Sequence, residues 1–510
     1  MPETSHSNYP WISDQADGTY KNPVLYADYS DPDVIQHGDD FYMISSSFNC
    51  TPGLPVLHSR DLVNWKLINH AVKNLPHPRY EEFHSGSGIW APSIRFHQGL
   101  FWIFFPMVED GIYVTTAKDP AGTWSEPRLV LAGKGLIDPC PFWDEDGQAY
   151  LVHAYARSRS GLRDKIHVRP MSPDATKILG DGKIVFEEPE RHPYMEGPKV
   201  HKKNGWYYIF APAGGVPQGW QAVLRSRHIY GPYEDKIVLE KGKTPINGPH
   251  QGALIELAHG EDWFLHFQDA GLYGRIVHLQ PVTWKDGWPR MGIDFDGNGV
   301  GEPVARWNKP SIPGKHAIET PATTDEFDGP TLGRQWQWNA NHRDNWISFS
   351  ERKNQLRFFS QPKKKADLLH VPSLLLQKFP ARAFTVETAL EFTARQPGEQ
   401  AGLIVVGRAH ATLALRQAND GTNLVFQIAN EDRWTQAIAT TSVHLRVTVR
   451  DGGACRFACG EGKSWTEIPV DFTAEQAEWI GARVGIYSLA PANGPTGFTD
   501  FAYFRFSGPI

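Results

Sequence analysis

One short pattern of apolar and polar positions recurs five times in the first three hundred residues. Each copy has a residue followed by proline, a short apolar strand, a polar turn and then an aromatic-rich strand. The prolines stand at 32, 92, 139, 198 and 249, so successive copies are 47 to 60 residues apart. The repeat predicts five β-hairpins of one kind, because short apolar runs joined by polar turns are typical of paired strands.

Polar segments that end in an aromatic residue separate these hairpins, as in 58–68, 115–124 and 224–234. We interpret these segments as the outer strands of the same units, which gives each unit four strands. Five such units without a long helical period predict a five-bladed β-propeller. A two-sheet sandwich is the alternative, but it would not explain five similar openings.

The character of the chain changes after Gly301, where a polar stretch contains prolines at 303, 309, 313 and 321. From about Asp325 short alternating strands resume, in segments such as 356–359, 384–392 and 444–451, and 419–421 and 451–452 are expected hairpin turns. The chain is therefore expected to be all-β, with a propeller at 1–303, a linker at 304–324 and a β-sandwich at 325–510.

Propeller geometry brings together residues that are far apart in the sequence. The first strand of each blade lines the central axis, so blade-opening residues meet on one face. Asp31, Asp138 and Glu196 hold such positions, and we expect three carboxyl groups in one axial pocket. Asp33 is a nearby competitor of Asp31, because positions two apart in a strand point to the same side.

Paired carboxyl groups are what glycosidic bond cleavage requires: one donates a proton to the leaving oxygen, and the other acts as base or nucleophile. An inverting pair stands roughly 6.5–9.5 Å apart, which suits groups on opposite sides of a propeller axis. A third carboxylate beside the acid raises the pKa of that acid by like-charge repulsion. Asp-Pro is common at turns, so the two aspartates alone would be weak indicators, but glutamate is unusual at the position of Glu196.

Composition narrows the range of functions. A net charge of −6 and no basic cluster argue against a nucleic-acid partner, and no apolar run is long enough for a membrane partner. The 18 tryptophans suit sheet cores and flat surfaces for sugar rings. Four cysteines lack metal-site spacing, and reduced thiols are expected. Without a signal-peptide pattern at the start, the sequence is expected to be cytoplasmic.

The blade-opening motifs resemble glycoside hydrolase family 43, in particular its β-xylosidases and α-L-arabinofuranosidases with a C-terminal sandwich, a concanavalin-like jelly roll. The motif at 29–32 resembles the family's opening motif, which implies that Asp31 is the general base. The motif at 137–139 implies that Asp138 tunes the acid, and the motif at 195–198 implies that Glu196 is the general acid. Ser30 stands where the family usually has proline.

The same resemblance implies a set of substrate-binding residues: Phe48 as an aromatic wall, Trp90 as a stacking or core residue, Arg275 as a substrate contact and His250 on the axis. It also implies that a calcium ion lies by His250, linked through water. A second candidate calcium site is the loop start Asp294, Asp296 and Asn298, which lacks a closing glutamate. No cofactor is expected to be required, and calcium would be structural.

These features together predict an exo-acting, inverting hydrolase that releases terminal xylose or arabinofuranose from short oligosaccharides. The sandwich is expected to close the pocket through the loop 490–494. Endo-arabinanase activity and carbohydrate binding without catalysis are the alternatives. The choice between xylose and arabinose, the parent polysaccharide and the oligomeric state stay open at this point.

Overall fold

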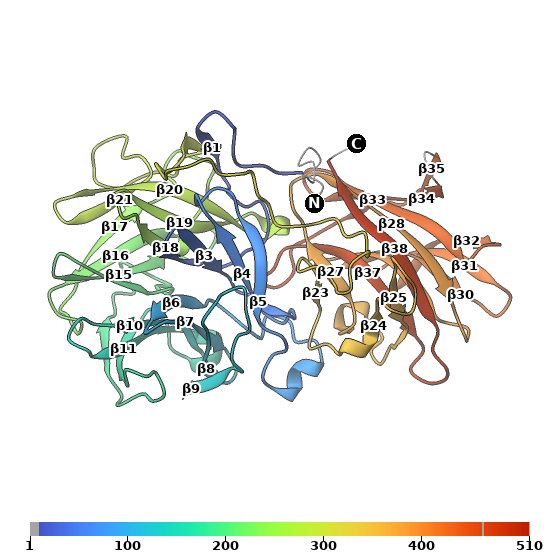
Figure 1. Ribbon diagram of the computed structural model, residues 1–510, viewed down its shortest axis with the longest axis horizontal. Helices are drawn as coiled ribbons and strands as arrows, with labels where there is room; N and C mark the ends of the chain where they lie inside the picture. Colours follow the sequence, from blue (N-terminus) through green and yellow to red (C-terminus); the bar gives the residue numbers. More distant parts are fainter. Residues whose placement is uncertain (1–9, 462–463, 509–510) are drawn as a thin grey trace.

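The computed structural model describes residues 10–461 and 464–508 and consists of two β domains lying side by side (Figure 1). The chain from blue to yellow-green builds the propeller, and the orange and red chain builds the sandwich. Within the described residues, α1 (Arg157–Ser160) is the only α-helix. No helix in that part of the chain is long and apolar enough to cross a membrane.

Five four-stranded antiparallel sheets form the blades, which confirms the predicted five-bladed propeller. In the first blade the strands are β2 (Asp33–His37), β3 (Asp40–Ile44), β4 (Gly53–Ser59) and β5 (Lys66–Val72). In the second they are β6 (Ser93–His97), β7 (Leu100–Met107), β8 (Gly111–Ala117) and β9 (Arg128–Ala132). The third contains β10 (Leu136–Trp143), β11 (Ala149–Tyr155), β12 (Ile166–Met171) and β13 (Lys183–Phe186).

The fourth blade contains β14 (Lys199–Lys203), β15 (Trp206–Ala213), β16 (Trp220–Ser226) and β17 (Glu234–Leu239). The fifth contains β18 (His250–Glu256), β19 (Asp262–Asp269), β20 (Arg275–Lys285) and β21 (Trp288–Met291). The ring closes where β18 contacts β2. Outside the blades, β1 (Thr19–Lys21) pairs with β22 (Arg306–Asn308), so the beginning of the chain is tied to the end of the propeller.

The polar segments that end in aromatic residues are centred on turns and are not themselves the outer strands, so that part of the prediction was wrong. Each runs from the end of the third strand of its blade into the turn before the fourth: β4 ends at Ser59 and β5 begins at Lys66. The aromatic residues stabilise these turns from inside. Trp65 Nε1 donates to Leu62 O at 2.8 Å and Trp124 Nε1 donates to Pro120 O at 3.2 Å, since a buried indole N–H needs an acceptor.

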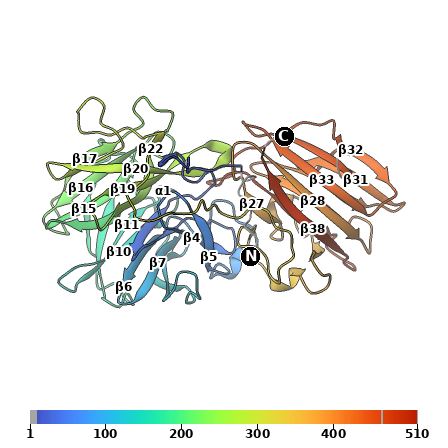
Figure 2. The same cartoon turned by 45° about the horizontal axis from the view of Figure 1, so that its top comes forward.

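The second domain is a sandwich of two eight-stranded sheets, as predicted (Figure 2). One sheet contains β23 (Gln337–Trp338), β26 (Gln361–Pro362), β27 (Leu375–Lys378), β29 (Gln400–Val406), β30 (His410–Gln417), β31 (Thr422–Ile428), β32 (Glu431–Ile438) and β37 (Arg483–Ala490). The other contains β24 (Ile347–Ser348), β25 (Leu356–Phe359), β28 (Phe384–Thr393), β33 (Ser442–Val449), β34 (Ala454–Glu461), β35 (Ser464–Glu467), β36 (Phe472–Thr473) and β38 (Phe498–Ser507).

The two domains share packing. The apolar core of the sandwich continues into the propeller through Tyr26, Tyr273 and Ile276. The segment between the domains also lies on the propeller, where Lys309 Nζ is 2.6 Å from Asp14 Oδ2 and 3.0 Å from Asp61 Oδ2. All four cysteines are free thiols.

Candidate active site

A cavity of about 300 Å³ opens on the propeller axis and contains the three predicted carboxyl groups. Its lining comes from the propeller and from one residue of the sandwich: Asp31, Phe48, Trp90, Ala91, Ile137, Asp138, Tyr194, Glu196, Gly215, Val216, Pro217, Gln251, Arg275 and Trp479. A larger cavity of about 670 Å³ lies between the domains. Its two carboxylates, Glu81 and Glu82, are paired with Arg343 and Lys365, so the axial cavity is the better candidate.

Asp31 precedes the first strand of blade one and is 5% exposed. Its φ of 56° lies in the left-handed region and not in the strand region. The rule that strand residues two apart point to the same side, which made Asp33 an alternative to Asp31, therefore does not apply at Asp31. Ser30 and Ser46 donate to Asp31 Oδ2 at 2.7 and 2.5 Å, and Arg275 Nη1 donates to Oδ1 at 3.0 Å. A carboxylate held only by donors is suited to act as a base.

Asp33 has a different role from Asp31. Its Oδ2 accepts hydrogen bonds from the backbone of Ile94 at 2.8 Å and from Arg95 Nη1 at 2.7 Å, and the residue is 1% exposed. It does not line the cavity. The carboxylate therefore joins the first blade to the second, and Asp31 alone of the two faces the pocket.

Asp138 lies within β10 where the pairing with β11 shifts register between Ile137 and Cys140. Such bulges re-aim side chains, and the φ of Asp138 is 55°. Its Oδ2 accepts the backbone N–H of Gly197 at 2.7 Å, so it is tied directly to the residue after Glu196. Burial, followed by the charge of Asp31, raises the pKa of Asp138, while the N–H of Gly197 and the Lys199 ammonium oppose that rise.

Glu196 precedes β14, and its backbone N–H donates to Pro212 O at 3.1 Å. Its side chain keeps 30% exposure, in the cavity. Burial raises the pKa of Glu196 well above its usual range, and the neighbouring charge of Asp138 raises it further. Asp138 accepts an N–H that favours its charged form, so the proton belongs on Glu196. This arrangement provides a carboxylic acid that stays protonated near neutral pH.

Arg275, the first residue of β20, links the base to the pocket wall. Its Nη1 contacts Asp31 and donates to Ser30 Oγ at 2.8 Å. Its Nε is buried and has no hydrogen-bond partner among the described residues. Because Arg275 also lines the cavity, its guanidinium places a permanently charged donor group beside the space that a sugar would occupy.

Three aromatic residues form one wall. Phe48 and Trp90 have ring centroids 6.5 Å apart, and Trp90 lies 6.1 Å from Trp479 in an edge-on arrangement. Trp479 belongs to the sandwich, is 42% exposed and has a φ of 65°. The Arg275 guanidinium lies 5.7 Å from the Trp479 ring. Apolar ring faces of this kind suit the C–H face of a sugar.

The loop that closes the pocket is the one containing Trp479, between β36 and β37, and the prediction of 490–494 was wrong. Ala490 O accepts the backbone N–H of Lys363 at 2.8 Å, which places that end of the loop within the sandwich. Alternation and turn signals locate loops but do not tell which loop of one domain meets another domain.

Asp28 couples the Trp479 loop to Arg275. Its Oδ1 accepts the backbone N–H of Arg275 and its Oδ2 accepts that of Gly481, both at 2.9 Å. The backbones approach closely here, because a Cβ on Gly481 would lie 2.6 Å from the backbone nitrogen of Gly274. One buried carboxylate thus fixes the sandwich loop and the substrate-facing arginine relative to each other.

The sandwich also holds the segment that contains Phe48. Thr51 and Trp338 exchange two backbone hydrogen bonds, of 3.1 and 2.6 Å, and Asn49 Nδ2 donates to Asn339 O at 2.7 Å. Arg483 Nη1 donates to Cys50 Sγ at 2.7 Å. The wall built from Phe48 therefore depends on contacts from the second domain.

His250 is fully buried behind the acid and does not line the cavity. Its Nε2 lies 3.4 Å from Glu196 Oε1, and burial lowers the pKa of His250 to about 3, so the imidazole is neutral. A calcium ion needs a set of oxygen ligands. Within residues 10–461 and 464–508 no group of three His, Cys, Asp or Glu side chains could hold a metal ion. The arrangement at His250 does not supply direct ligands, and the water-linked calcium ion that the resemblance implies there stays a prediction.

The second candidate calcium site is a turn that is stabilised by its own side chains. Asp294 Oδ2 accepts the backbone N–H of Gly299 at 3.0 Å and lies 3.3 Å from Arg290 Nη1. Asp296 accepts from the backbone and side chain of Asn298, both at 3.2 Å. These oxygens are engaged by donors of the turn, whereas Asp294 Oδ1 is buried without a partner among the described residues, and a metal role for these residues stays a prediction.

Comparison with known proteins agrees with this site. The description "Glycosyl hydrolases family 43" matches residues 20–289, which contain all three carboxyl groups, and "Beta xylosidase C-terminal Concanavalin A-like domain" matches residues 324–507. The chain belongs to glycosyl hydrolase family 43. The predicted resemblance is thereby confirmed, as are the glycosidase class and the fold.

Relatives of this family 43 hydrolase cover from 72% to 97% of its length. A protein of Xylanibacter ruminicola is 46% identical over 368 residues, which are 72% of this chain and 67% of the relative. A β-xylosidase of Formosa agariphila is 32% identical and covers 97% of this chain and 91% of its own. The crystal structure of xylan β-1,4-xylosidase from Bacillus halodurans C-125 is 25% identical, with a TM-score of 0.85, and covers 96% of this chain and 99% of that one.

Among the residues of the site in this family 43 hydrolase that the sequence analysis did not predict are Asp28, Tyr194 and Trp479. Tyr194 stands two residues before Glu196, and that proximity was an available signal. Trp479 lies in a polar segment of the sandwich, where an isolated tryptophan was a weak signal. Asp28 acts only through backbone N–H groups of distant segments, which no local pattern indicates.

Proposed function

We propose that this protein is an exo-acting, inverting glycoside hydrolase that releases a terminal xylose or arabinofuranose residue from short oligosaccharides. The observation that carries the proposal is the pairing in one pocket of an acid with a raised pKa, Glu196, and a carboxylate held by donors, Asp31. Names of relatives support the choice of sugars: one is a β-xylosidase, and another, from Bacteroides ovatus and 30% identical, is a non-reducing end α-L-arabinofuranosidase.

In the proposed reaction Glu196 donates its proton to the glycosidic oxygen while Asp31 takes a proton from the attacking water. The water attacks the anomeric carbon on the face opposite to the departing group, which inverts the configuration. Arg275 and the two serines orient Asp31, and Asp138 keeps the proton on Glu196. After product release Glu196 regains a proton from solvent and Asp31 loses one.

The exo mode is supported by the small size of the cavity. Its volume of about 300 Å³ is at the small end for ligand sites, and Trp479 of the sandwich forms part of its wall. An endo-arabinanase would need an open cleft that a polymer could cross. Product lengths from linear arabinan distinguish the two: single sugars support the exo mode, and mixed oligomers would reject it.

The first test measures hydrolysis of 4-nitrophenyl β-D-xylopyranoside and 4-nitrophenyl α-L-arabinofuranoside side by side by wild type and by Glu196→Gln. Turnover of one or both by wild type, strongly reduced in the variant, supports the proposal and ranks the two sugars. Because the 4-nitrophenolate leaving group needs less protonation, the deciding comparison uses a disaccharide of the same sugar, on which equal turnover by the variant would overturn the assignment of the acid. A folded wild-type protein that binds these sugars without cleaving them would indicate carbohydrate binding without catalysis.

A further inference from the structure

An exposed aromatic residue stands on the rim of the pocket beside the acid. Tyr194 lines the cavity, is 52% exposed and has a φ of 56°. A bulky residue in the left-handed region is costly unless its surroundings hold it there. An exposed ring gains little by burial, so the strain points to a role for the ring itself.

Tyr194 is held by a support of charged groups. Asp164, which is 5% exposed, accepts the backbone N–H of Tyr194 and lies 2.9 Å from Arg163 Nε. The Arg163 guanidinium lies 4.7 Å from the ring centroid, over one face of the ring. A stacked guanidinium fixes the orientation of the ring and leaves the other face free.

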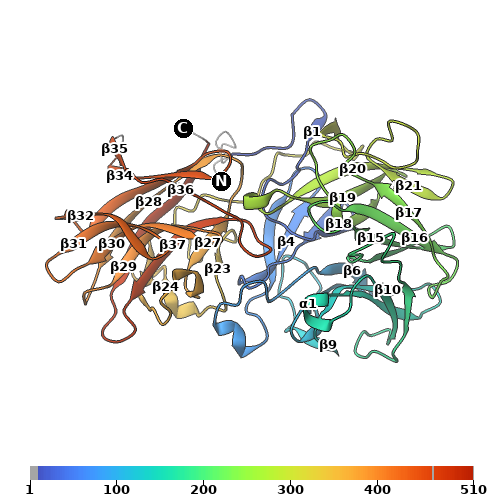
Figure 3. The same cartoon turned by 180° about the vertical axis from the view of Figure 1, so that it is seen from behind.

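The support comes from the loop that contains α1, between β11 and β12 (Figure 3). The same loop places the Arg159 guanidinium 6.0 Å from the Trp90 ring. Two arginines of one loop therefore contact two aromatic residues of the pocket. Because both contacts come from the same loop, we interpret the loop as a support for the aromatic residues of the pocket.

The position of Tyr194 identifies which part of a substrate it would meet. It is two residues from Glu196, whose proton goes to the leaving oxygen, and it neighbours the segment 215–217, which also lines the cavity. Arg275, which contacts Asp31, and Trp479, whose ring lies 5.7 Å from the Arg275 guanidinium, lie on the side of the base instead. Tyr194 is thus on the side of the leaving group.

We propose that Tyr194, supported by Arg163 and Asp164, is the stacking platform of a leaving-group subsite that takes the second sugar ring of a short, neutral oligosaccharide. This inference rests on the proposed function and adds the recognition of the departing sugar. Val216 and Pro217 give the subsite an apolar edge, and Tyr194 contacts the substrate without taking part in proton transfer.

The test compares β-1,4-xylobiose with methyl β-D-xylopyranoside, or α-1,5-arabinobiose with methyl α-L-arabinofuranoside where arabinose is the preferred sugar. Both members of a pair need protonation by Glu196, but only the disaccharide has a second ring. For Tyr194→Ala we expect kcat/KM on the disaccharide to fall roughly five- to tenfold, in the range of one aromatic contact, and kcat/KM on the methyl glycoside to change less than twofold. Tyr194→Phe, which keeps the ring, should retain the wild-type ratio.

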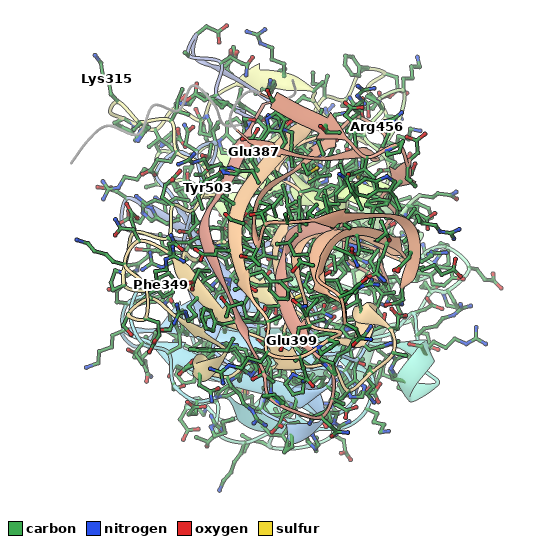
Figure 4. All side chains as sticks on the ribbon, turned by 90° about the vertical axis from the view of Figure 1, so that its right-hand side faces the viewer. Lys315, Phe349, Glu387, Glu399, Arg456 and Tyr503 are labelled. Atoms are coloured by element: carbon green, nitrogen blue, oxygen red, sulfur yellow. The ribbon has the colours of Figure 1, made fainter. Side chains whose placement is uncertain are left out.

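A matched control is Tyr503→Ala, because Tyr503 also has a stacked guanidinium, that of Arg505 at 4.0 Å, but lies on the sandwich (Figure 4). We expect no change on either substrate. Equal losses on the two substrates of a pair for Tyr194→Ala would overturn the subsite, since the tyrosine would then act through Glu196. Wild-type rates on both would overturn it as well. Failure of wild type to hydrolyse any of these glycosides would instead contradict the proposed function.

Discussion

Two buried or half-buried glutamates, one in each domain, show how the domains differ. Glu399 of the sandwich is fully buried and accepts backbone N–H groups from Arg395 at 2.7 Å, Gln396 at 3.0 Å and Gly497 at 2.7 Å (Figure 4). Glu196 of the propeller accepts no hydrogen bond from a described residue; neutral His250 lies 3.4 Å from its Oε1, and the charge of Asp138 is close enough to raise its pKa. A satisfied carboxylate stabilises a fold, whereas an unsatisfied one beside another carboxylate holds a proton that it can give away.

The contrast extends to what each domain provides to the pocket. The propeller provides three carboxyl groups from corresponding places in three blades, with Arg275 as their only cation on the lining. The sandwich provides one ring, Trp479, and many backbone contacts that hold the propeller's own wall. The propeller thus provides the catalytic carboxyl groups, and the sandwich completes and supports the wall of the pocket.

The largest expected effect is on Glu196. Glu196→Gln removes the proton donor, and kcat/KM on a disaccharide should fall about 10²–10⁴-fold, with little change in Tm. A 4-nitrophenyl glycoside, whose leaving group needs less protonation, should lose less. Equal losses on both substrates would mean that Glu196 does not act as the acid.

A substitution at Glu399 should have the opposite character. Glu399→Gln replaces one carboxylate oxygen with an NH₂ group, which cannot accept the backbone N–H group that faces it. The loss of this hydrogen bond should lower the free energy of unfolding by about 1–3 kcal/mol. Activity per folded molecule at 25 °C should stay within twofold. Glu431→Gln, at a sandwich carboxylate that is 69% exposed, is the control and should leave Tm unchanged. A full loss of activity in folded Glu399→Gln would contradict the assignment of a purely structural role to Glu399.

The contact between the domains is tested at Asp28. In Asp28→Asn one side-chain oxygen becomes an NH₂ group, so the backbone N–H of either Arg275 or Gly481 loses its acceptor. For an interaction worth about 1.4 kcal/mol we expect KM to rise about tenfold, with a smaller change in kcat. Combined with Trp479→Ala, the effect should be less than additive, because both act on one wall. Asp61→Asn, at a carboxylate that accepts the backbone N–H groups of Val63 and Asn64 away from the pocket, should lower Tm without changing KM.

The smallest effect concerns pH. Glu196 must hold its proton, so kcat/KM falls as pH rises through its pKa. Asp138→Asn removes the neighbouring charge, which is second to burial as a cause of the raised pKa. The basic limb should therefore move to lower pH, by roughly one unit. A shift to higher pH, or an unchanged limb in an active variant, would show that Asp138 does not tune the acid.

Much of the fold was predictable because a propeller repeats its pattern. Five Xaa-Pro openings fixed the number of blades, and strict alternation placed sandwich strands such as β25, at Leu356–Phe359, without error. The outer strands were misplaced, since Trp65 and Trp124 pack inside turns and their apolar character looked like strand. Alternation does not separate a strand from a turn with a buried indole.

The site was predictable where it follows from that repeat. Asp31, Asp138 and Glu196 meet because they open three blades. His250, predicted to bind substrate, is fully buried at the start of β18, 3.4 Å from the acid, and does not line the cavity. Trp479 and Asp28 were not predictable, since they depend on how two domains dock, which no local periodicity encodes.

The most direct test of the central claim, that Glu196 and Asp31 act from opposite faces of the sugar, is the configuration of the first product. Proton NMR during early hydrolysis of the preferred substrate, before mutarotation, reads the anomeric proton of the released sugar. We expect inversion: α-xylose from a β-xyloside, or β-arabinofuranose from an α-arabinofuranoside. Retained configuration in the first product would contradict it and would make Asp31 a nucleophile instead of a base.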